Sequence, residues 1–289
     1  MLPSPSLTAT RYAILFFVMT MITSLTALGV QIALPASGDD ARSRLANSPR
    51  HTEWVTIESR GDKIEAYVVY PERSSNAPIV VVIHEIYGLN DWARSVADQL
   101  AAEGFIAIAP DMLSGKGPNN TGSTSLDRQS AVSLMRSLQP TEVIRRINMS
   151  VEYATMLPAA TQRFGIIGFC WGGSASFNFA TTRDDLGAAV VYYGTSPSKE
   201  SLRRVQAPIQ GFYGGDDQRV NATIEPAQAE MDRLGKLYEA NIYEGAGHGF
   251  LRAQTDRDGA NMAASEICLL YTSDAADDTP CVDLGGRRI

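Results

Sequence analysis

A cysteine between glycines, placed where a strand pattern gives way to a helix pattern, constrains the fold more than any other feature of this chain. The stretch is Gly168-Phe169-Cys170-Trp171-Gly172, with the apolar run Phe164 to Ile167 before it and the helix-like segment Ser174 to Ala180 after it. A nucleophile in such a strained turn needs small neighbours, because side chains there would collide with the adjoining strand and helix. The helix N-terminus also favours a thiolate. The stretch therefore predicts a nucleophile elbow that carries sulfur, and the alternative is a buried structural cysteine.

Length and charge limit the class of protein. The chain has 289 residues, of which 44% are hydrophobic, enough for one sizeable core but not comfortably for two. Its formal net charge is -7, which argues against nucleic acid or an anionic membrane surface as the main partner, since both attract a basic field. We expect a single folded domain that is a monomer and whose ligand is a small soluble molecule.

The N-terminus differs in kind from the rest. Arg11 precedes an uncharged apolar segment, Ile14 to Ala33, and small residues follow it. This pattern is typical of a signal peptide cleaved before Asp39, and the alternative is an uncleaved membrane anchor. We interpret residues 1–38 as signal peptide or anchor, so the folded part is expected in the periplasm or secreted. Residues 39–50 are polar without periodicity and are expected to form a linker outside the fold.

The C-terminus has an unusual composition. The stretch Cys268-Leu269-Leu270-Tyr271-Thr272-Ser273-Asp274-Ala275-Ala276-Asp277 resembles the translation of a transposon-type sequencing adapter. We interpret residues 268–289 as read-through, and the alternative is a genuine disordered acidic tail. Without the two cysteines of this tail, Cys170 is the only cysteine of the expected domain, residues 51–267, so no disulfide could form there even in an oxidising compartment.

Between these ends, predicted strands and helices alternate as in an α/β protein with a mostly parallel central sheet and helices on both faces. The alternating segments Trp54 to Ile57 and Ile64 to Tyr70 predict an antiparallel hairpin, and Ile79 to Ile83 has the β-branched composition of a strand buried on both faces. Further strands are predicted at Phe105 to Ala109, Phe164 to Gly168, Ala188 to Tyr193, Ile209 to Tyr213 and Ala240 to Tyr243. Helices are predicted at Asp91 to Glu103, Leu126 to Leu138, Thr141 to Met156 and Glu225 to Leu237, with a closing helix starting at Asp258.

Two acid–base groups follow predicted strands, at the edge where open α/β sheets bind ligands. Asp216-Asp217 comes after Gly214-Gly215, and His248 lies within Ala246-Gly247-His248-Gly249-Phe250. The glycines allow a tight loop in which the imidazole could take the thiol proton while an aspartate orients its other nitrogen. The order Cys, Asp, His along the chain is that of the α/β-hydrolase fold, which we therefore predict. The alternative for His248 is an ordinary loop residue.

With these motifs in order, the chain resembles the dienelactone hydrolase family from about Trp54 to Ile267. Cys170, Asp217 and His248 match the triad of that family. Asp217 is preferred on the Gly-Gly-x-Asp register, and Asp216 remains the alternative. The resemblance implies hydrolysis of a lactone or small carboxylic ester through an acyl-enzyme, and thiolate, imidazole and backbone donors need no metal or organic cofactor.

A second stretch, His84-Glu85-Ile86-Tyr87-Gly88, resembles the family's loop after the third strand. By this resemblance Glu85 contacts the resting thiol, and the backbone N–H groups of Ile86 and Trp171 form the oxyanion hole. A carboxylate beside a thiol favours its neutral form, which would protect an exported cysteine from oxidation. Tyr87 is expected at the substrate. The alternative, His84-Glu85 as a metal-binding pair, lacks a third ligand at usable spacing.

Two arginines complete the expected site. Arg252 stands where the family places an arginine for the substrate carboxylate, and Arg128 matches a second one, although Val132 replaces the aromatic residue expected after it. The alternative for both is a solvated surface arginine. Three other functions stay open: a broad carboxylesterase or polyester-cleaving thiol hydrolase, a non-catalytic exported binding protein on the same fold, and a redox protein using Cys170, which lacks a resolving cysteine.

Overall fold

The central sheet has eight strands in the order β1-β2-β4-β3-β5-β6-β7-β8 in the computed structural model, which describes residues 34–59 and 61–267. The strands are β1 Thr52–Ser59, β2 Asp62–Val69, β3 Ala77–Ile83, β4 Ile106–Pro110, β5 Ala160–Phe169, β6 Ala189–Tyr192, β7 Ile209–Gly214 and β8 Tyr238–Tyr243. β2 pairs antiparallel with β1 and β4, and every other neighbouring pair is parallel. The predicted hairpin and mostly parallel sheet are confirmed.

Helices connect the strands close to where the sequence predicts them. They are α2 Ala41–Ala46, α3 Asp91–Ala102, α4 Arg128–Ser137, α5 Pro140–Thr155, α6 Trp171–Ala180, α7 Lys199–Leu202, α8 Gln218–Asn221 and α9 Ile224–Arg233, and residues 260–267 are also helical. Local signals fix several starts. The side chains of Asn90 and Asp127 accept hydrogen bonds from the first turns of α3 and α4, and Pro140 opens α5. The short helices α2, α7 and α8 were not predicted.

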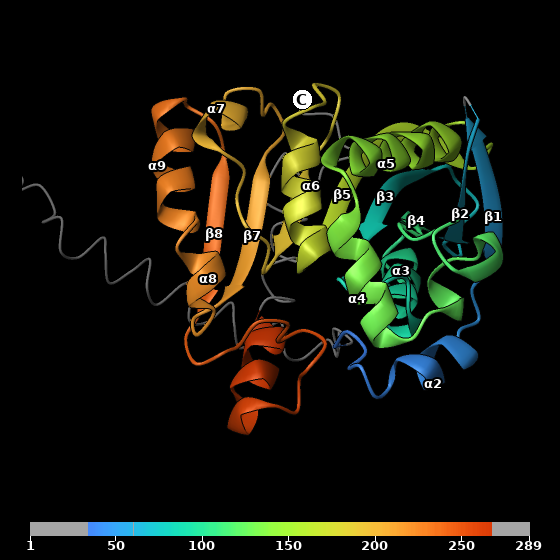
Figure 1. Cartoon of the computed structure of the whole chain (residues 1–289), viewed down its shortest axis with the longest axis horizontal. Coiled ribbons are helices and arrows are strands. Elements are labelled where there is room, and N and C mark those ends of the chain that lie inside the picture. Colours follow the sequence, from blue (N-terminus) through green and yellow to red (C-terminus); the bar gives the residue numbers. More distant parts are fainter. Residues whose placement is uncertain (1–33, 60, 268–289) are drawn as a thin grey trace, which may run out of the picture. The chain divides into compact units, whose positions relative to one another are not determined.

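Alternate residues of the central strands enter different apolar cores. In β3, Ile79, Val81 and Ile83 pack with the core under α4, α5, α6, α7 and α9, whereas Val80 and Val82 pack with the core that includes α2 and α3. Figure 1 shows α5, α6 and α9 in front of the sheet and α3 behind it. Burial on both faces explains the continuous β-branched run. It also leaves the carboxyl edge of the parallel strands as the place where their loops meet.

The segment before β1 belongs to the fold, so the prediction of a linker over residues 39–50 is wrong. The carbonyl oxygen of Ala36 accepts a hydrogen bond from Trp92 Nε1 at 2.9 Å, and the N–H of Gly38 donates to the carbonyl of Arg252 at 2.8 Å. Helix α2 packs on α3, with Ala41 fully buried. Small apolar residues beside a tryptophan make these contacts, and so short a segment shows no periodicity that would predict them.

The two predicted terminal extensions lie outside the described residues, with one exception. Residues 1–33 and 268–289 are not described, whereas residues 34–38, which were predicted to be the end of a signal peptide or anchor, are part of the fold. Within residues 34–59 and 61–267, no helix combines the length and apolar character needed to cross a bilayer.

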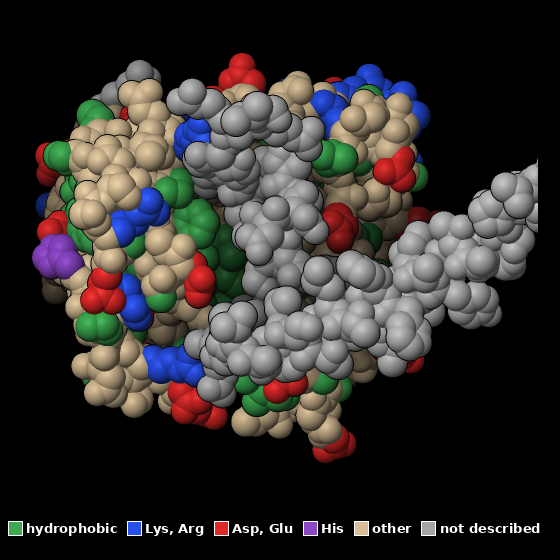
Figure 2. Space-filling model, turned by 180° about the vertical axis from the view of Figure 1, so that it is seen from behind, with side chains coloured by type: hydrophobic (Ala, Val, Ile, Leu, Met, Phe, Trp, Pro, Cys, Tyr) green, Lys and Arg blue, Asp and Glu red, His purple; other side chains and the backbone are tan. Residues whose placement is uncertain are grey.

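Charge on the described surface is mixed in sign. On the face seen in Figure 2, Lys and Arg side chains lie among Asp and Glu side chains. Together with the net charge of -7, this pattern is that of an ordinary solvated surface, as expected from the sequence.

Candidate active site

The turn between β5 and α6 holds Cys170 in a strained backbone conformation, with φ 56° and ψ -114°. The flanking glycines are required by close backbone approach. A Cβ atom on Gly168 would lie 2.0 Å from the carbonyl oxygen of Gly172, and one on Gly172 would lie 2.3 Å from that of Ile83. The N–H of Cys170 donates to the carbonyl of Tyr192 at 3.0 Å, which ties the turn to β6. The sharp turn predicted from the sequence is present, and α6 starts directly after the cysteine.

His248 lies between the cysteine and an aspartate. Its Nε2 is 3.0 Å from Cys170 Sγ, and its Nδ1 is 2.5 Å from Asp217 Oδ2. Asp217 is buried at the end of β7, whereas Asp216 is half exposed and forms an ion pair with Arg257. The structure therefore brings Cys170, His248 and Asp217 together, as the Gly-Gly-x-Asp register predicted. The alternative, Asp216, contacts Arg257 and not His248.

The electrostatics of this trio favour a charged imidazole. Burial disfavours the charged form, but hydrogen bonds to Asp217 and Cys170 outweigh it and raise the pKa of His248 to about 9. Burial also opposes ionisation of Asp217, yet the hydrogen bond with His248 leaves the pKa of Asp217 below its usual value. At neutral pH the geometry thus supports an imidazolium held between a carboxylate and a sulfur atom.

Glu85 contacts an arginine and not the thiol. Its side chain is 2% exposed, and Glu85 Oε2 accepts a hydrogen bond from Arg252 Nε at 2.6 Å. The predicted contact with Cys170 is not present, because a buried carboxylate is stabilised far more by a guanidinium than by a weak thiol donor. Burial nevertheless raises the pKa of Glu85, with the charge of Arg252 acting against it.

The two expected arginines meet over Tyr87. The guanidinium carbon of Arg128 lies 3.8 Å from the centroid of the Tyr87 ring, and that of Arg252 lies 5.3 Å from it. All three side chains line a cavity of about 570 Å³. Gly38 of the N-terminal segment lines it too, and a Cβ atom there would lie 3.2 Å from Arg252 Cγ. The structure therefore gathers the predicted substrate-binding residues in one cavity, to which a segment not predicted to be folded contributes.

The loop after β3 is fixed through His84. Its Nε2 accepts a hydrogen bond from the N–H of Met112 at 3.1 Å, so Nδ1 carries the proton and donates to the carbonyl of Glu85 at 2.7 Å. Burial lowers the pKa of His84 and keeps the imidazole neutral. Both ring nitrogens are occupied, which argues against the metal-pair alternative. Residues 34–59 and 61–267 contain no group of three or more His, Cys, Asp or Glu side chains placed to hold a metal ion.

The same loop approaches the start of α6. Gly172 lies against the carbonyls of Ile83 and His84, and the rings of His84 and Trp171 stack with centroids 6.5 Å apart. In the described part of the chain, the backbone N–H groups of Trp171 and Ile86 have no hydrogen-bond acceptor. The N–H of Trp171 directly follows the cysteine, where an oxyanion hole needs one of its donors.

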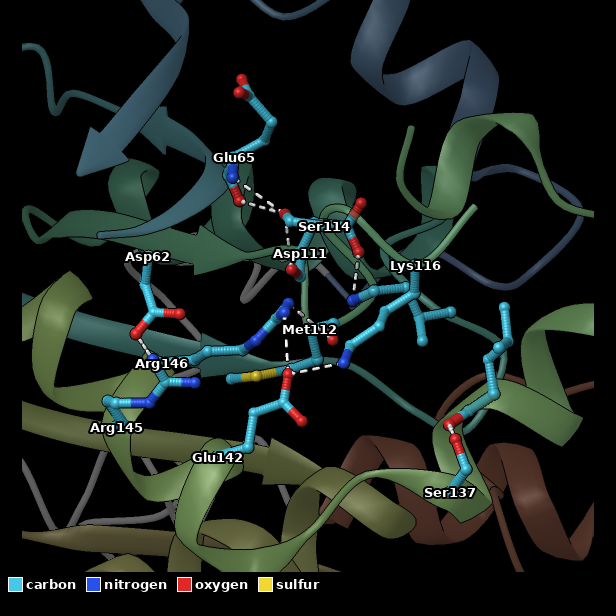
Figure 3. A network of polar contacts seen from close by, with 12 residues as sticks. Asp62, Glu65, Asp111, Met112, Ser114, Lys116, Ser137, Glu142, Arg145 and Arg146 are labelled. Carbon is cyan, nitrogen blue, oxygen red and sulfur yellow. Dashed lines mark hydrogen bonds and ion pairs between the residues drawn. The ribbon is translucent and has the colours of Figure 1, made fainter. Parts of the chain in front are cut away.

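Behind the loop lies a polar network that the sequence analysis did not identify. Arg146 donates to the carbonyl of Met112 at 3.0 Å and forms an ion pair with Glu142 at 2.9 Å, and Lys116 reaches the same carboxylate at 2.9 Å. Figure 3 shows these side chains pointing toward one another between α5 and the chain after β4. A buried arginine on a helix has no sequence signal of its own.

A second part of this network holds the loop itself. Asp111 accepts a hydrogen bond from the N–H of Ser123 at 2.7 Å and another from the Ser123 hydroxyl. That hydroxyl in turn accepts from the N–H of Leu89 at 2.9 Å. An aspartate directly after a buried strand, at Pro110-Asp111, was the available signal for this role.

Comparison with known proteins identifies the family of this chain. Residues 64–274 match the Dienelactone hydrolase family. A carboxymethylenebutenolidase of Pseudomonas putida is 27% identical over 221 residues, 74% of this chain and 92% of that protein. The solved structure of dienelactone hydrolase from Anabaena variabilis matches this chain with a TM-score of 0.59 and 21% sequence identity. That of a dienelactone hydrolase-like promiscuous phosphotriesterase from metagenomic libraries matches with a TM-score of 0.64 and 22% identity. Each match covers 78% of this chain and 98% of the other chain. The chain belongs to the dienelactone hydrolase family, with the α/β-hydrolase fold and the hydrolase class predicted from its sequence.

Proposed function

We propose that the protein hydrolyses small esters or lactones that carry a carboxylate, with Cys170 as nucleophile. The observation that carries the proposal is the position of His248, which contacts both Cys170 Sγ and Asp217 Oδ2. The name of the relative from Pseudomonas putida supports the same reaction class.

The geometry gives each group a step. His248 holds the thiol proton while the sulfur of Cys170 attacks the carbonyl carbon of the ester, and the N–H groups of Ile86 and Trp171 donate to the resulting oxyanion. The bond to the leaving oxygen then breaks, His248 protonates that oxygen, and a thioester remains on Cys170. Neutral His248 next takes a proton from water, the hydroxide attacks the thioester, and the acid and the free thiol are released. Asp217 keeps the imidazole oriented throughout.

The preference for a carboxylate follows from the charges of the cavity. Arg128 and Arg252 both line it, and Glu85 occupies only the Nε of Arg252 in the described contacts. The terminal nitrogens of a guanidinium can accept a second carboxylate in the same plane. An acidic substrate would therefore be drawn toward Tyr87 and the two arginines.

A matched pair of substrates tests the proposal. Mono(p-nitrophenyl) adipate and p-nitrophenyl hexanoate differ only in a terminal carboxylate in place of a methyl group, and a carboxylated enol-lactone would extend the pair. We expect faster turnover of the adipate ester and complete inhibition by iodoacetamide. A chain with Cys268→Ser and Cys281→Ser should keep both properties, which assigns the sensitivity to Cys170.

Other results would select the alternatives. Thiol-sensitive turnover confined to the hexanoate ester would indicate a general esterase or polyester-cleaving thiol hydrolase. Stoichiometric binding without a burst of p-nitrophenol would indicate a binding protein. Turnover that iodoacetamide leaves intact would remove Cys170 from the reaction.

A further inference from the structure

The chain before α2 lies along one side of the cavity of about 570 Å³. We call residues 35–42 the N-terminal strap. At one end of the contact, the N–H of Gly38 donates a hydrogen bond to the carbonyl of Arg252 at 2.8 Å. At the other, the carbonyl of Ala36 accepts a hydrogen bond from Trp92 Nε1 at 2.9 Å. The strap thus joins the loop after β8 to the first turn of α3, and both of these elements also line the cavity.

The strap is held in place by its own buried residues. Ala36 and Ser37 are buried, and so is Ala41 at the start of α2. The hydroxyl of Ser37 donates to the carboxylate of Asp40 at 2.8 Å and accepts a hydrogen bond from the N–H of Asp40 at 3.1 Å. Buried anchors and local hydrogen bonds fix a backbone in one conformation, because breaking them leaves desolvated polar groups. The exposed residues of the strap are therefore presented to the cavity in a defined position.

Gly38 lies directly against the side chain of Arg252. A Cβ atom on Gly38 would lie 3.2 Å from Arg252 Cγ and 3.9 Å from Arg252 Cδ. Farther along the same side chain, Nε donates to Glu85 at 2.6 Å, and Nη2 would lie 3.6 Å from a Cβ atom on Gly249. Gly249 directly follows His248 in the sequence. The strap therefore holds the aliphatic part of Arg252, while its guanidinium lies beside the loop that carries the histidine of the site.

The strap also contributes charge to the cavity. Asp39 and Arg42 line it, and Arg42 forms an ion pair with Asp91 at 3.0 Å. Within residues 34–59 and 61–267, Asp39 forms no ion pair. Its exposed carboxylate shares the cavity with Arg128 and Arg252, so it lowers the attraction that these arginines exert on an acidic ligand.

We propose that the N-terminal strap determines the preference for acidic substrates, because Gly38 positions Arg252 for the substrate carboxylate and Asp39 limits the positive charge of the cavity. This inference rests on the proposed function and deepens it. The family match begins at residue 64, so the strap lies outside the part of the chain that carries the catalytic motifs. Neutral esters do not use the guanidinium of Arg252 and are therefore insensitive to the strap.

The substitution Gly38→Val places a side chain against Arg252. Gly38 has no positive φ, so the backbone tolerates the change and its effect comes from the displaced arginine. We expect kcat/KM for mono(p-nitrophenyl) adipate to fall about tenfold, the order expected for a weakened hydrogen bond to a charged group, and that for p-nitrophenyl hexanoate to stay within about twofold. Gly38→Ala, which adds only the Cβ atom, should give a smaller change in the same direction.

Ser43→Val is the matched control. Among the described residues, Ser43 is exposed on α2 and does not line the cavity. This variant should leave the ratio of the two esters unchanged. Equal losses on both esters in Gly38→Val would mean that the strap has only a structural role, and no loss on the adipate ester would mean that Gly38 does not position Arg252. Either result would overturn the inference.

Asp39→Asn tests the strap without adding bulk. Removal of the negative charge should raise kcat/KM for the adipate ester about twofold at low ionic strength and leave that for the hexanoate ester unchanged, and the gain should disappear in about 0.5 M salt. Glu200→Gln is the control, because it changes the net charge equally at an exposed position on α7. The same gain in Glu200→Gln, or no gain in Asp39→Asn, would overturn the role of Asp39.

A binding measurement separates this inference from the proposed function. Calorimetry with monomethyl adipate should show about tenfold weaker binding to Cys170→Ala/Gly38→Val than to Cys170→Ala alone. If the unmodified protein turned over neither ester, the proposed function would fail, and this difference in affinity would still support carboxylate binding beside the strap. Equal affinities would reject the inference whether or not the esters are hydrolysed.

Discussion

Two clusters of polar residues lie at the carboxyl edge of the sheet, the first largely buried and the second reaching the surface at His248. They differ in how completely their hydrogen-bonding groups are satisfied. In the support cluster, defined as His84, Asp111, Ser123, Glu142 and Arg146, every side chain has hydrogen-bond or ion-pair partners. In the site cluster, defined as Glu85, Cys170, Tyr193, Asp217, His248 and Arg252, two residues have positive φ and one hydroxyl is unpartnered.

The difference indicates what each cluster contributes. Satisfied buried polar groups hold a loop in one conformation, because breaking any of them leaves a desolvated partner. Strained and partly satisfied groups lower the stability of the resting fold and leave donors and charges for a substrate. We therefore expect substitutions in the support cluster to reduce stability first, and those in the site cluster to reduce activity with little loss of stability.

Cys170→Ala should give the largest effect. We expect turnover of either p-nitrophenyl ester to fall at least about a thousandfold, as for loss of a catalytic nucleophile, with a melting temperature within a few degrees of the original. Steady-state kinetics measures the turnover, and calorimetry measures the melting temperature. A large drop in melting temperature would show that Cys170 also stabilises the fold, and it would contradict the expected difference between the support cluster and the site cluster.

Arg146→Ala should give the largest loss of stability. Its side chain is 9% exposed. Removing it leaves the Glu142 carboxylate paired with Lys116 alone and the Met112 carbonyl without this donor, so the free energy of unfolding should fall by about 3 kcal/mol. Urea denaturation measures it. The control is Arg145→Ala, whose half-exposed ion pair with Asp62 should contribute less than about 1 kcal/mol.

Ser123→Ala probes the junction of the two clusters. The hydroxyl links Asp111 to the N–H of Leu89, so its loss should destabilise the fold by about 1 to 2 kcal/mol and raise KM for the adipate ester by loosening the loop. The exposed Ser133→Ala serves as control. Unchanged KM together with reduced stability would mean that the support cluster acts independently of the site.

Raising the pH should lower kcat/KM gradually, through deprotonation of His248. The pKa of His248 is raised above its ordinary value to about 9, so the imidazolium is complete at neutral pH and is lost as pH rises through 9. Because the proposed mechanism gives this proton to the leaving oxygen, we expect kcat/KM to fall about tenfold per pH unit above 9. Asp217→Asn, which removes one cause of the shift, should move this limb to lower pH. A limb that does not move would exclude His248 as its origin.

Sequence patterns predicted the parts of the molecule that depend on local order. The β-branched run of β3, the glycines around Cys170 and the chain order of Asp217 and His248 each carry their own signal. These patterns gave the sheet, the strained turn and the trio of side chains that the structure brings together.

The remainder depends on contacts between distant segments. Glu85 pairs with Arg252, 167 residues away, and no pattern near either residue distinguishes that partner from the thiol. The left-handed φ of Tyr193 occurs where its ring packs against that of His248, and nothing in a Tyr-Tyr-Gly sequence requires it. The Glu85–Arg252 pair and the conformation of Tyr193 thus depend on tertiary packing, which no local sequence pattern encodes.

The docking of the N-terminal segment also sets the order of events in folding. Gln254 Nε2 donates to the carbonyl of Pro35 at 2.9 Å, across a separation of 219 residues. Residues 34–38, which are synthesised early, can therefore dock beside Arg252 only after the loop that contains Gln254 has been synthesised. Contacts of such long range are made late and close large loops. A partly synthesised chain would have the elbow cysteine but an incomplete cavity beside Arg252. The carboxylate preference that we propose would therefore be acquired only after the N-terminal segment has docked.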